Sequence, residues 1–228
     1  MILGIYGKKD SGKTQLMEKL VGHFAKEYRV ATVKHIGQSG FSIDRAGTDT
    51  MRHAEAGAAL VVASSDVETS FLLKESRDIG EIENIICRLG DFDLILAEGF
   101  KSADIPKIMV GKGRKRKNTL MRYEGDFEGL VQMMEGMLSI ERVHRKLPHL
   151  DCGECGYDCH GLAELIEAGE KGFRDCHYFT ESWIRIEVDG EPIPLGRFAA
   201  DFVSNTLAGM LSSLKKVGEI RDVRIEME

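Results

Sequence analysis

The sequence has few of the features that mark a membrane or secreted protein. No run of residues approaches the roughly 20 consecutive apolar residues that a bilayer-spanning helix requires, and charged residues make up 30% of the chain. The first apolar segment starts at residue 2, which leaves no room for a secretory signal peptide. We therefore expect a cytoplasmic protein that has no membrane partner.

The chain also has no excess of positive charge and no disulfide framework. Its net charge is −6 at pH 7, so no overall positive field would attract nucleic-acid backbones, and we expect no nucleic-acid partner. Four of the five cysteines lie between residues 152 and 176, which indicates a local device rather than a set of disulfides. At 228 residues and 43% hydrophobic content, the chain suits one domain of ordinary size and a smaller one.

The first 28 residues have the organisation of a phosphate-binding P-loop. Residues 2–6 are mostly apolar and predict a buried strand, and residues 15–28 form an amphipathic run that predicts a helix. Between them lies the sequence Gly7-Lys8-Lys9-Asp10-Ser11-Gly12-Lys13-Thr14. A strand, a glycine-bounded loop and a helix in this order form the context that a P-loop requires. The alternative is a glycine-rich turn that matches by chance.

Each part of this segment has a chemical reason. Gly7 and Gly12 let the backbone turn tightly, so that several N–H groups can point at one anion. The helix adds its free N-terminal N–H groups and the positive end of its dipole. Lys13 would reach the β- and γ-phosphates, and the Thr14 hydroxyl would bind Mg²⁺. The segment predicts a nucleotide-binding protein.

The rest of the first 145 residues alternates strands and helices. We expect strands at 29–35, 58–63, 67–73 and 106–110, and helices at 48–56, 79–89 and 127–143. A strand–helix–strand start implies parallel strands and a right-handed crossover. The polar loop at 37–47 would then lie at the carboxyl ends of the strands, where α/β proteins hold ligands. Cys87 stands alone on its helix, and we expect it to be a buried small hydrophobic residue.

Residues 92–101 form a second informative segment. An apolar strand ends in Glu98 and is followed by a glycine, which is the placement of a Walker B acid. A carboxylate there can hold Mg²⁺ through water or orient an attacking water. We therefore treat Lys13 and Glu98 as candidate catalytic residues. The alternative is an acid that merely starts a turn.

A basic loop follows the strand at 106–110. It places five lysines and arginines within residues 112–117. The loop is either solvated and mobile or a positive patch for nucleotide phosphates or an anionic pterin phosphate. RNA binding is the weaker interpretation, because no aromatic residues are interleaved to stack on bases.

The cysteines form one motif in the last third of the chain. Cys152, Cys155 and Cys159 lie close together, and Cys176 follows after a helical segment. Thiolates favour Zn²⁺ or an iron–sulfur cluster, and structural zinc usually uses two separated Cys-x-x-Cys pairs. The three-plus-one spacing therefore favours a [4Fe–4S] cluster, with Zn²⁺ or free thiols as alternatives. Beyond it, a strand at 182–188, a helix at 198–214 and a strand at 220–227 would form a tail.

We thus expect an α/β fold of the P-loop NTPase type with a mostly parallel sheet, followed by a small cysteine-rich module and an α+β tail. The predicted domains are a GTP-binding domain at 1–145, a four-cysteine module at 146–180 and the tail at 181–228. The tail shows no obvious chemistry, so we interpret it as a dimer or partner module.

Residues 1–140 resemble the molybdopterin-guanine dinucleotide biosynthesis protein B (MobB) family. The resemblance rests on the P-loop, on Thr32-Val-Lys-His35, on Gly47-Thr-Asp-Thr-Met-Arg52 running to Ala56-Gly-Ala58, and on Leu96-Ala-Glu-Gly-Phe-Lys101. It implies a dimeric GTP-binding protein that assists the guanylylation of molybdopterin. In that family a partner nucleotidyltransferase, the MobA-like A protein, performs the transfer, and the B protein itself hydrolyses GTP weakly.

Residues 150–176 are similar to a separate family of small [4Fe–4S] domains with a Cys-Gly-x-Cys-Gly-Tyr motif. Only Gly156, Tyr157 and Asp158 separate the second and third cysteines here, one residue fewer than that pattern has. The departure concerns the geometry of the cluster rather than its ligand set. Since the basic B protein has no such tail, this chain would be a specialised form.

The resemblance leaves the recognised base and the roles of several residues open. The sequence has no Asn-Lys-x-Asp motif, so a preference for guanine rests on the resemblance alone. Lys8, or alternatively Lys9, could cross to the phosphates of a partner subunit. Asp49 and Arg52 could touch phosphate or pterin, the alternative being a helix cap and a solvated charge. Two rival functions are a small-molecule kinase with the basic loop as its lid, and a metal-sensing or electron-transfer adapter that uses nucleotide only to set its dimer.

Overall fold

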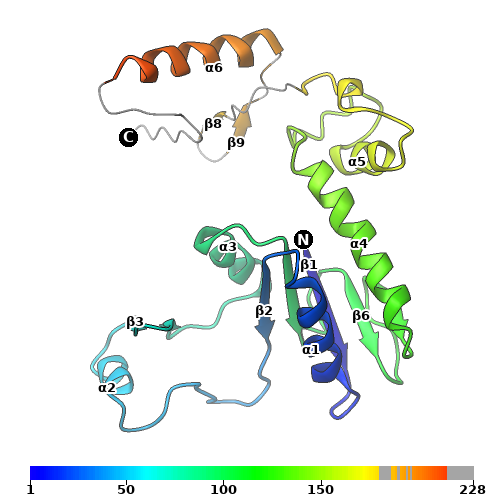
Figure 1. The fold of residues 1–228 in the computed structure, drawn as a ribbon. Helices are drawn as coiled ribbons and strands as arrows, with labels where there is room; N and C mark the ends of the chain where they lie inside the picture. The colour runs from blue at the N-terminus through cyan, green and yellow to red at the C-terminus, as the bar shows by residue number, and fades with distance from the viewer. Residues whose placement is uncertain (180–185, 189–190, 194, 196, 215–228) are drawn as a thin grey trace. The chain divides into compact units, whose positions relative to one another are not determined.

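This computed structural model describes residues 1–179, 186–188, 191–193, 195 and 197–214. The chain divides into two compact units, Met1–Val131 and Gln132–Glu228. Figure 1 gives the order of their elements along the chain. The expected strand at 220–227 and most of the expected strand at 182–188 lie outside the described residues.

The first unit is built on a five-stranded parallel sheet. Its strands are β1 (Ile2–Gly7), β2 (Val30–Lys34), β5 (Leu94–Glu98), β6 (Lys107–Val110) and β7 (Thr119–Tyr123), in the order β2-β5-β1-β6-β7. Each neighbouring pair is parallel. All residues of β5 and β6 are buried, as expected for central strands of a sheet covered on both faces. The predicted α/β class with a mostly parallel sheet is confirmed.

Helix α1 (Lys13–Phe24) covers part of one face of this sheet (Figure 1). It buries Leu16, Met17, Leu20 and Phe24, which recur every three or four residues and so form one stripe. Because β1 runs directly into the loop before α1, burying this stripe also fixes where the loop lies. The glycine-bounded segment therefore stands at the carboxyl ends of the strands.

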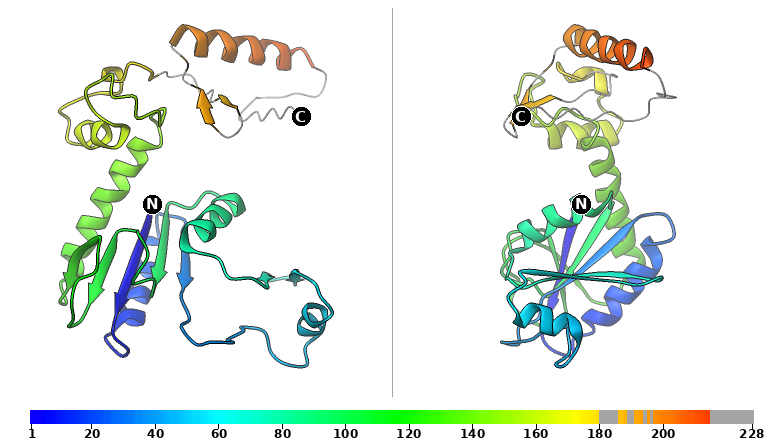
Figure 2. Two further views of the ribbon diagram at one scale, coloured as in Figure 1. Left: turned by 180° about the vertical axis from the view of Figure 1, so that it is seen from behind. Right: turned by 90° about the vertical axis from the view of Figure 1, so that its left-hand side faces the viewer.

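A long excursion separates β2 from the next strand of the sheet. It contains α2 (Asp49–Glu55), β3 (Leu60–Ser64) and β4 (Thr69–Leu73). Strands β3 and β4 pair only with each other, antiparallel. Both strands were predicted from the sequence, but they form a separate hairpin instead of joining the parallel sheet. Figures 1 and 2 show this segment leaving the sheet after β2.

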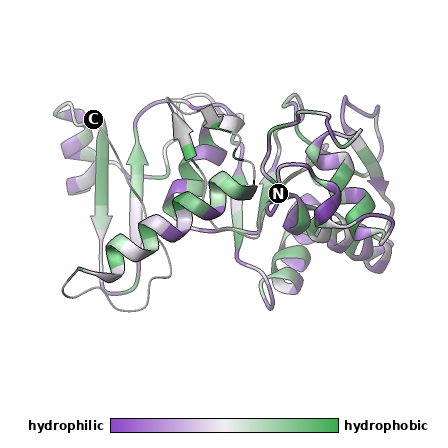
Figure 3. Cartoon of the chain, turned by 90° about the horizontal axis from the view of Figure 1, so that it is seen from above, coloured by the Kyte–Doolittle hydropathy of each residue, from purple (hydrophilic) through white to green (hydrophobic). Residues whose placement is uncertain are grey.

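One face of this hairpin is apolar and exposed. Leu60 lies opposite Leu73 and Val62 opposite Phe71, and these four side chains are 37–55% exposed. The two strands at the left of Figure 3 carry mostly hydrophobic or neutral residues. Such a face needs a cover, because an isolated two-stranded hairpin is at best marginally stable in water.

Helix α3 (Ile79–Leu89) follows the hairpin and has the same character. Asp78 and Glu81 form a capping box at its start, so the local signals for a helix are strong. No residue of α3 is buried, and Leu89 is 59% exposed. The expectation that Cys87 is buried is wrong: it is exposed. The helix predicted at 79–89 is confirmed, but nothing in this unit covers Cys87.

The second unit contains the cysteines and the remaining helices. Helix α4 (Phe127–His144) spans the division between the units, and α5 (Cys159–Glu167), a 3₁₀ turn (Phe173–Asp175), β8 (Ile186–Val188), β9 (Glu191–Ile193) and α6 (Arg197–Ser212) follow. The helices predicted at 127–143 and 198–214 are confirmed as α4 and α6. In the part of the chain that the structure describes, no helix is long and apolar enough to cross a membrane.

Candidate nucleotide site and cysteine cluster

The loop between β1 and α1 is shaped by its two glycines. Gly12 has φ of 87° at the N-cap position of α1, in the left-handed region that favours glycine. A Cβ on Gly7 would lie 2.4 Å from the carbonyl oxygen of Val110 and 2.6 Å from the Ser11 hydroxyl. No real side chain tolerates such distances, so the close approach of β1 to β6 requires glycine here.

The loop lysine points back over its own loop. The ammonium group of Lys13 donates a hydrogen bond to the backbone carbonyl of Lys8. The Lys13 side chain therefore turns from the first residue of α1 back to the start of the loop. Lys8 and Lys9 lie in the turn before it, and their proposed role toward a partner subunit stays a prediction.

The two residues expected to place a metal lie together. Thr14 Oγ1 donates to Glu98 Oε1 over 3.4 Å. This contact arises because β1 and β5 pair in parallel with Ile5 opposite Glu98, which brings the end of β5 to the start of α1. The Glu98 side chain is 12% exposed, so a charged group stands at the edge of the core.

A third residue at this position was not predicted to have a role. Lys34 ends β2 and lies opposite Glu98 in the β2–β5 register. Its ammonium group is 3.3 Å from Glu98 Oε2. Next to it, the backbone N–H of His35 donates to the Glu98 carbonyl oxygen over 2.8 Å. The sequence alone places Lys34 only within the Thr32-Val-Lys-His35 motif, because Glu98, its neighbour in the site, is 64 residues further along the chain.

Asp49 and Arg52 are not brought to this site within one chain. They pair with each other across 3.3 Å on α2, with side chains 85% and 73% exposed. The helix cap is Thr48, whose side chain accepts from the N–H of Met51. Figure 1 shows α2 away from the loop before α1. Their contact with phosphate or pterin stays a prediction.

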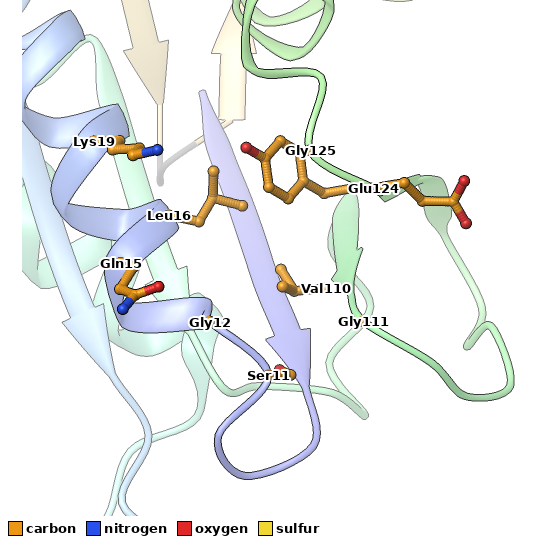
Figure 4. Close-up of a pocket in the computed structure, with 10 residues that line it drawn as sticks. Ser11, Gly12, Gln15, Leu16, Lys19, Val110, Gly111, Glu124 and Gly125 are labelled. Atoms are coloured by element: carbon orange, nitrogen blue, oxygen red, sulfur yellow. The ribbon is translucent and has the colours of Figure 1, made fainter.

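A cavity of about 330 Å³ adjoins the loop on the side of β6 and β7. Leu16, Gln15 and Lys19 of α1 line one side and Val110 lines the other (Figure 4). Glu124 also borders the cavity, but its carboxylate points away from α1 in Figure 4. The Ser11 hydroxyl oxygen is buried without a hydrogen-bond partner. The volume of the cavity falls at the low end of small-molecule sites, which span roughly 300–1,000 Å³.

The basic loop is partly fixed to the domain. The N–H of Arg116 donates to the Tyr6 hydroxyl over 2.9 Å, and Lys117 pairs with Asp104 at 3.1 Å. The hydrogen bond from Lys117 lowers the pKa of the Asp104 carboxyl. At least this half of the loop is therefore not the freely mobile segment that one interpretation of the sequence described.

A buried lysine supports the segment that follows Glu98. Lys107 is 1% exposed and its ammonium group donates to the carbonyl of Ala103. Burial lowers the pKa of Lys107, and the nearby Asp104 carboxylate opposes that shift. Lys107 thus connects β6 to the turn after β5.

The cysteines gather at one apolar cluster in the second unit. Cys159 and Cys176 are 6% and 4% exposed and pack with Leu147, Leu162 and Ala163, and Cys155 packs against this cluster. Cys152 is exposed. Burial raises the pKa of the Cys159 and Cys176 thiols, and the charges of Cys155 and Cys152 raise that of Cys176 further.

The sulfurs do not form a ligand set in this arrangement. Among the residues described, no three His, Cys, Asp or Glu side chains come close enough together to hold a metal. Thiol groups are nevertheless the kind of ligand that an iron–sulfur cluster requires. Three of the four, Cys155, Cys159 and Cys176, belong to or pack against the same apolar cluster. The neighbouring histidines face glutamates instead: His160 lies 3.6 Å from Glu164 and His177 lies 3.7 Å from Glu154.

Comparison with known proteins gives two matches along the chain. Residues 2–132 match the family model described as "Molybdopterin guanine dinucleotide synthesis protein B". Residues 147–178 match the model described as "Putative Fe-S cluster". Both resemblances predicted from the motifs are confirmed.

Individual relatives agree with these matches. The chain is 31% identical over its whole length to the "Putative molybdopterin-guanine dinucleotide biosynthesis adapter protein" of Methanocaldococcus jannaschii, covering 97% of that protein. It is 32% identical to the corresponding adapter protein of Haemophilus influenzae over 51% of this chain and 66% of that one. Among solved structures, Bacillus subtilis MobB aligns with a TM-score of 0.48 and 18% identity, over 59% of this chain and 96% of that chain.

The surroundings of Gly7 in the loop and Gly22 in α1 predict opposite effects on stability when each is replaced by alanine. Gly7→Ala should destabilise the protein by about 1–3 kcal/mol, because the new methyl group overlaps Val110 and Ser11. Gly22→Ala, on an open face of α1 with nothing within 4 Å, should stabilise it by about 0.5–1 kcal/mol. Urea unfolding of the two variants checks this. Equal effects would show that Gly7 is not constrained as described.

Proposed function

The chain belongs to the molybdopterin guanine dinucleotide synthesis protein B family, and we propose that it binds Mg·GTP and acts as an adapter in the formation of molybdopterin guanine dinucleotide. The observation that carries the proposal is the contact between Thr14 and Glu98 at the end of the glycine-bounded loop. A hydroxyl and a carboxylate that meet where a helix begins are the two protein groups that place Mg²⁺ beside a bound triphosphate. The proposed setting is the cytoplasm.

Each part of the loop then has a task. The N–H groups of residues 8–14 and the start of α1 would surround the phosphates. Lys13 would leave the Lys8 carbonyl and neutralise phosphate charge, while Thr14 and Glu98 would hold Mg²⁺, which supplies further neutralisation when it is bound. Glu98 already has a partner at each oxygen. This supports a role in holding the metal over one as a free general base, and it agrees with weak hydrolysis of GTP.

The sheet order gives the nucleotide a direction. Glu98 and the metal site lie on the β5 side of β1, and the 330 Å³ cavity lies on the β6–β7 side. The metal binds the β- and γ-phosphates, so the nucleoside would extend the other way, into the cavity. Leu16 and Val110 offer it an apolar surface, and Ser11, Gln15 and Lys19 offer polar groups.

We also propose that the protein is a homodimer through the β3–β4 hairpin. Its exposed face of Leu60, Val62, Phe71 and Leu73 is larger than scattered surface residues and therefore marks an interaction site. A second copy presents the same apolar surface, and a two-fold interface is self-complementary by symmetry. Lys8, Lys9, Asp49 and Arg52 could then serve a neighbouring subunit.

The adapter role implies a second protein. Two relatives are named adapter proteins of molybdopterin-guanine dinucleotide biosynthesis, and an adapter needs an enzyme to assist. We propose a MobA-like nucleotidyltransferase as that enzyme and its molybdopterin substrate as the other component. The free part of the basic loop supplies positive charge for the phosphate of that substrate.

For the second unit we propose a [4Fe–4S] cluster held by Cys152, Cys155, Cys159 and Cys176. The match of residues 147–178 to an iron–sulfur family and the shared location of the thiols support it. When bound, such a cluster supplies one-electron chemistry or a structural cross-link. Zinc remains the alternative metal for the same thiolates.

The first test is an equilibrium competition between Mg·GTP and Mg·ATP, with the protein kept free of oxygen. We expect a preference for GTP of about tenfold or more, which corresponds to about 1.4 kcal/mol. Lys13→Ala should weaken both nucleotides together, because it removes phosphate contacts only. Equal binding or a preference for ATP would favour the kinase and metal-sensing alternatives, and turnover of a set of acceptors would then identify a kinase.

The dimer proposal predicts that Phe71→Asp produces monomers. Each copy would lose the burial of one aromatic side chain, which stabilises the dimer by about 1.5–3 kcal/mol. Because the interface is two-fold, the substitution removes this stabilisation from both subunits. Sedimentation equilibrium measures the change in association. Leu120→Asp changes an apolar side chain that is 45% exposed on β7 and should leave the dimer intact. A monomeric unmodified protein would contradict the proposal.

The cluster proposal is tested on the two exposed cysteines. Cys152→Ser should lose most of the iron and sulfide that the intact protein takes up under anaerobic reconstitution, because it removes one ligand without disturbing the core. Cys87→Ser is the matched control and should bind the same amount as the unmodified protein. If protein purified without oxygen contains zinc and no iron, the cysteines hold zinc instead of an iron–sulfur cluster.

A further inference from the structure

Lys34 has a position that the site described so far does not use. It is the last residue of β2 and lies opposite Glu98 in the parallel register. Its ammonium group is 3.3 Å from one carboxylate oxygen of Glu98, and the Thr14 hydroxyl is 3.4 Å from the other. The acid therefore has a cation at one oxygen and a hydroxyl at the other.

The cation in this pair is the mobile partner. The Glu98 side chain is 12% exposed, whereas that of Lys34 is 58% exposed. A lysine carries its charge on a flexible four-carbon chain with rotatable bonds. The carboxylate is thus fixed at the edge of the core, and the ammonium group can move without disturbing the packing.

Binding of Mg²⁺ at Thr14 and Glu98 would change the charges around Lys34. The metal would compete with the ammonium group for the same carboxylate, and two cations at one acid repel each other. Lys34 would then need another anion nearby. The terminal phosphate is the anion that arrives together with the metal, on the β5 side of the loop.

We propose that Lys34 senses the terminal phosphate: it pairs with Glu98 in the absence of nucleotide and moves to the γ-phosphate when a metal–triphosphate complex binds. This inference rests on the proposed nucleotide binding and adds to it a basis for distinguishing triphosphate from diphosphate. A diphosphate brings no γ-phosphate, so in that complex Lys34 has no terminal phosphate to move to and adds no contact to the nucleotide.

A purely structural role for Lys34 makes a different prediction. If Lys34 only held Glu98 in place, its removal would weaken all metal–nucleotide complexes alike, because both nucleotides use the same metal position. If Lys34 contacts the γ-phosphate, only the triphosphate complex loses a charge-assisted hydrogen bond. The ratio of the two affinities separates the roles.

The experiment measures dissociation constants for Mg·GTP and Mg·GDP by calorimetry, with the full-length protein and Lys34→Met. We expect the variant to bind Mg·GTP about tenfold more weakly and Mg·GDP within about twofold of the unmodified protein. Lys34→Arg should recover most of the difference because it restores the positive charge. Lys26→Met removes an exposed lysine beyond the far end of α1 and should leave both affinities unchanged.

A second background separates a direct contact from an effect through Glu98. In Glu98→Gln the ion pair is already absent, so a lysine that acted only through Glu98 could have no further effect. We expect Lys34→Met to lower the GTP-to-GDP affinity ratio in this background as well. Equal weakening of both nucleotides, or no change of the ratio in Glu98→Gln, overturns the inference. Failure of the unmodified protein to bind either nucleotide overturns the proposed function itself and is seen before any variant is made.

Discussion

The parallel pairing of β1 with β5 is the constraint on which the rest of the candidate nucleotide site depends. It places a carboxylate at the edge of an apolar core, where an ionised group without a partner is costly. Thr14 and Lys34 satisfy the two oxygens of Glu98, and they come from two different neighbours of β5. The loop before α1, the start of that helix and the end of β2 therefore have to meet at one point for the sheet to be stable with Glu98 in place.

Features encoded in a continuous stretch of chain were predictable from the sequence. The glycine-bounded loop, the strand before it and the helix after it depend on neighbouring residues, and Glu98 is recognisable because it ends an apolar run. Lys34 was not recognised as part of the site, because its role arises from a strand register between segments 64 residues apart. Strand β7 was also missed: Thr119–Tyr123 mixes polar and apolar residues at the edge of the sheet, and its pairing with β6 is what orders it.

The hairpin and α3 show a different limit of sequence patterns. The sequence predicted β3 and β4 as strands and α3 as a helix, but such a prediction does not place the element relative to the rest of the fold. Nor does it tell what covers an apolar face. Here the hairpin face and Leu89 are exposed in the single chain, and the strands form their own sheet because the excursion leaves the parallel sheet after β2. Cys87 was therefore misplaced for the same reason that the hairpin becomes a candidate interface.

The cysteine cluster combines two requirements that oppose each other. Cys159 and Cys176 pack as small hydrophobic side chains, and burial raises their pKa, which favours the neutral thiol. A metal centre needs thiolates, so binding of the proposed cluster would release protons and rearrange the sulfurs. The segment carrying the other two proposed ligands lies largely outside the apolar cluster: Cys152 is exposed, and Gly153 and Gly156 turn the chain with positive φ. The apolar cluster thus gives the second unit a core that does not depend on a metal, while the proposed ligand Cys152 stands outside that core.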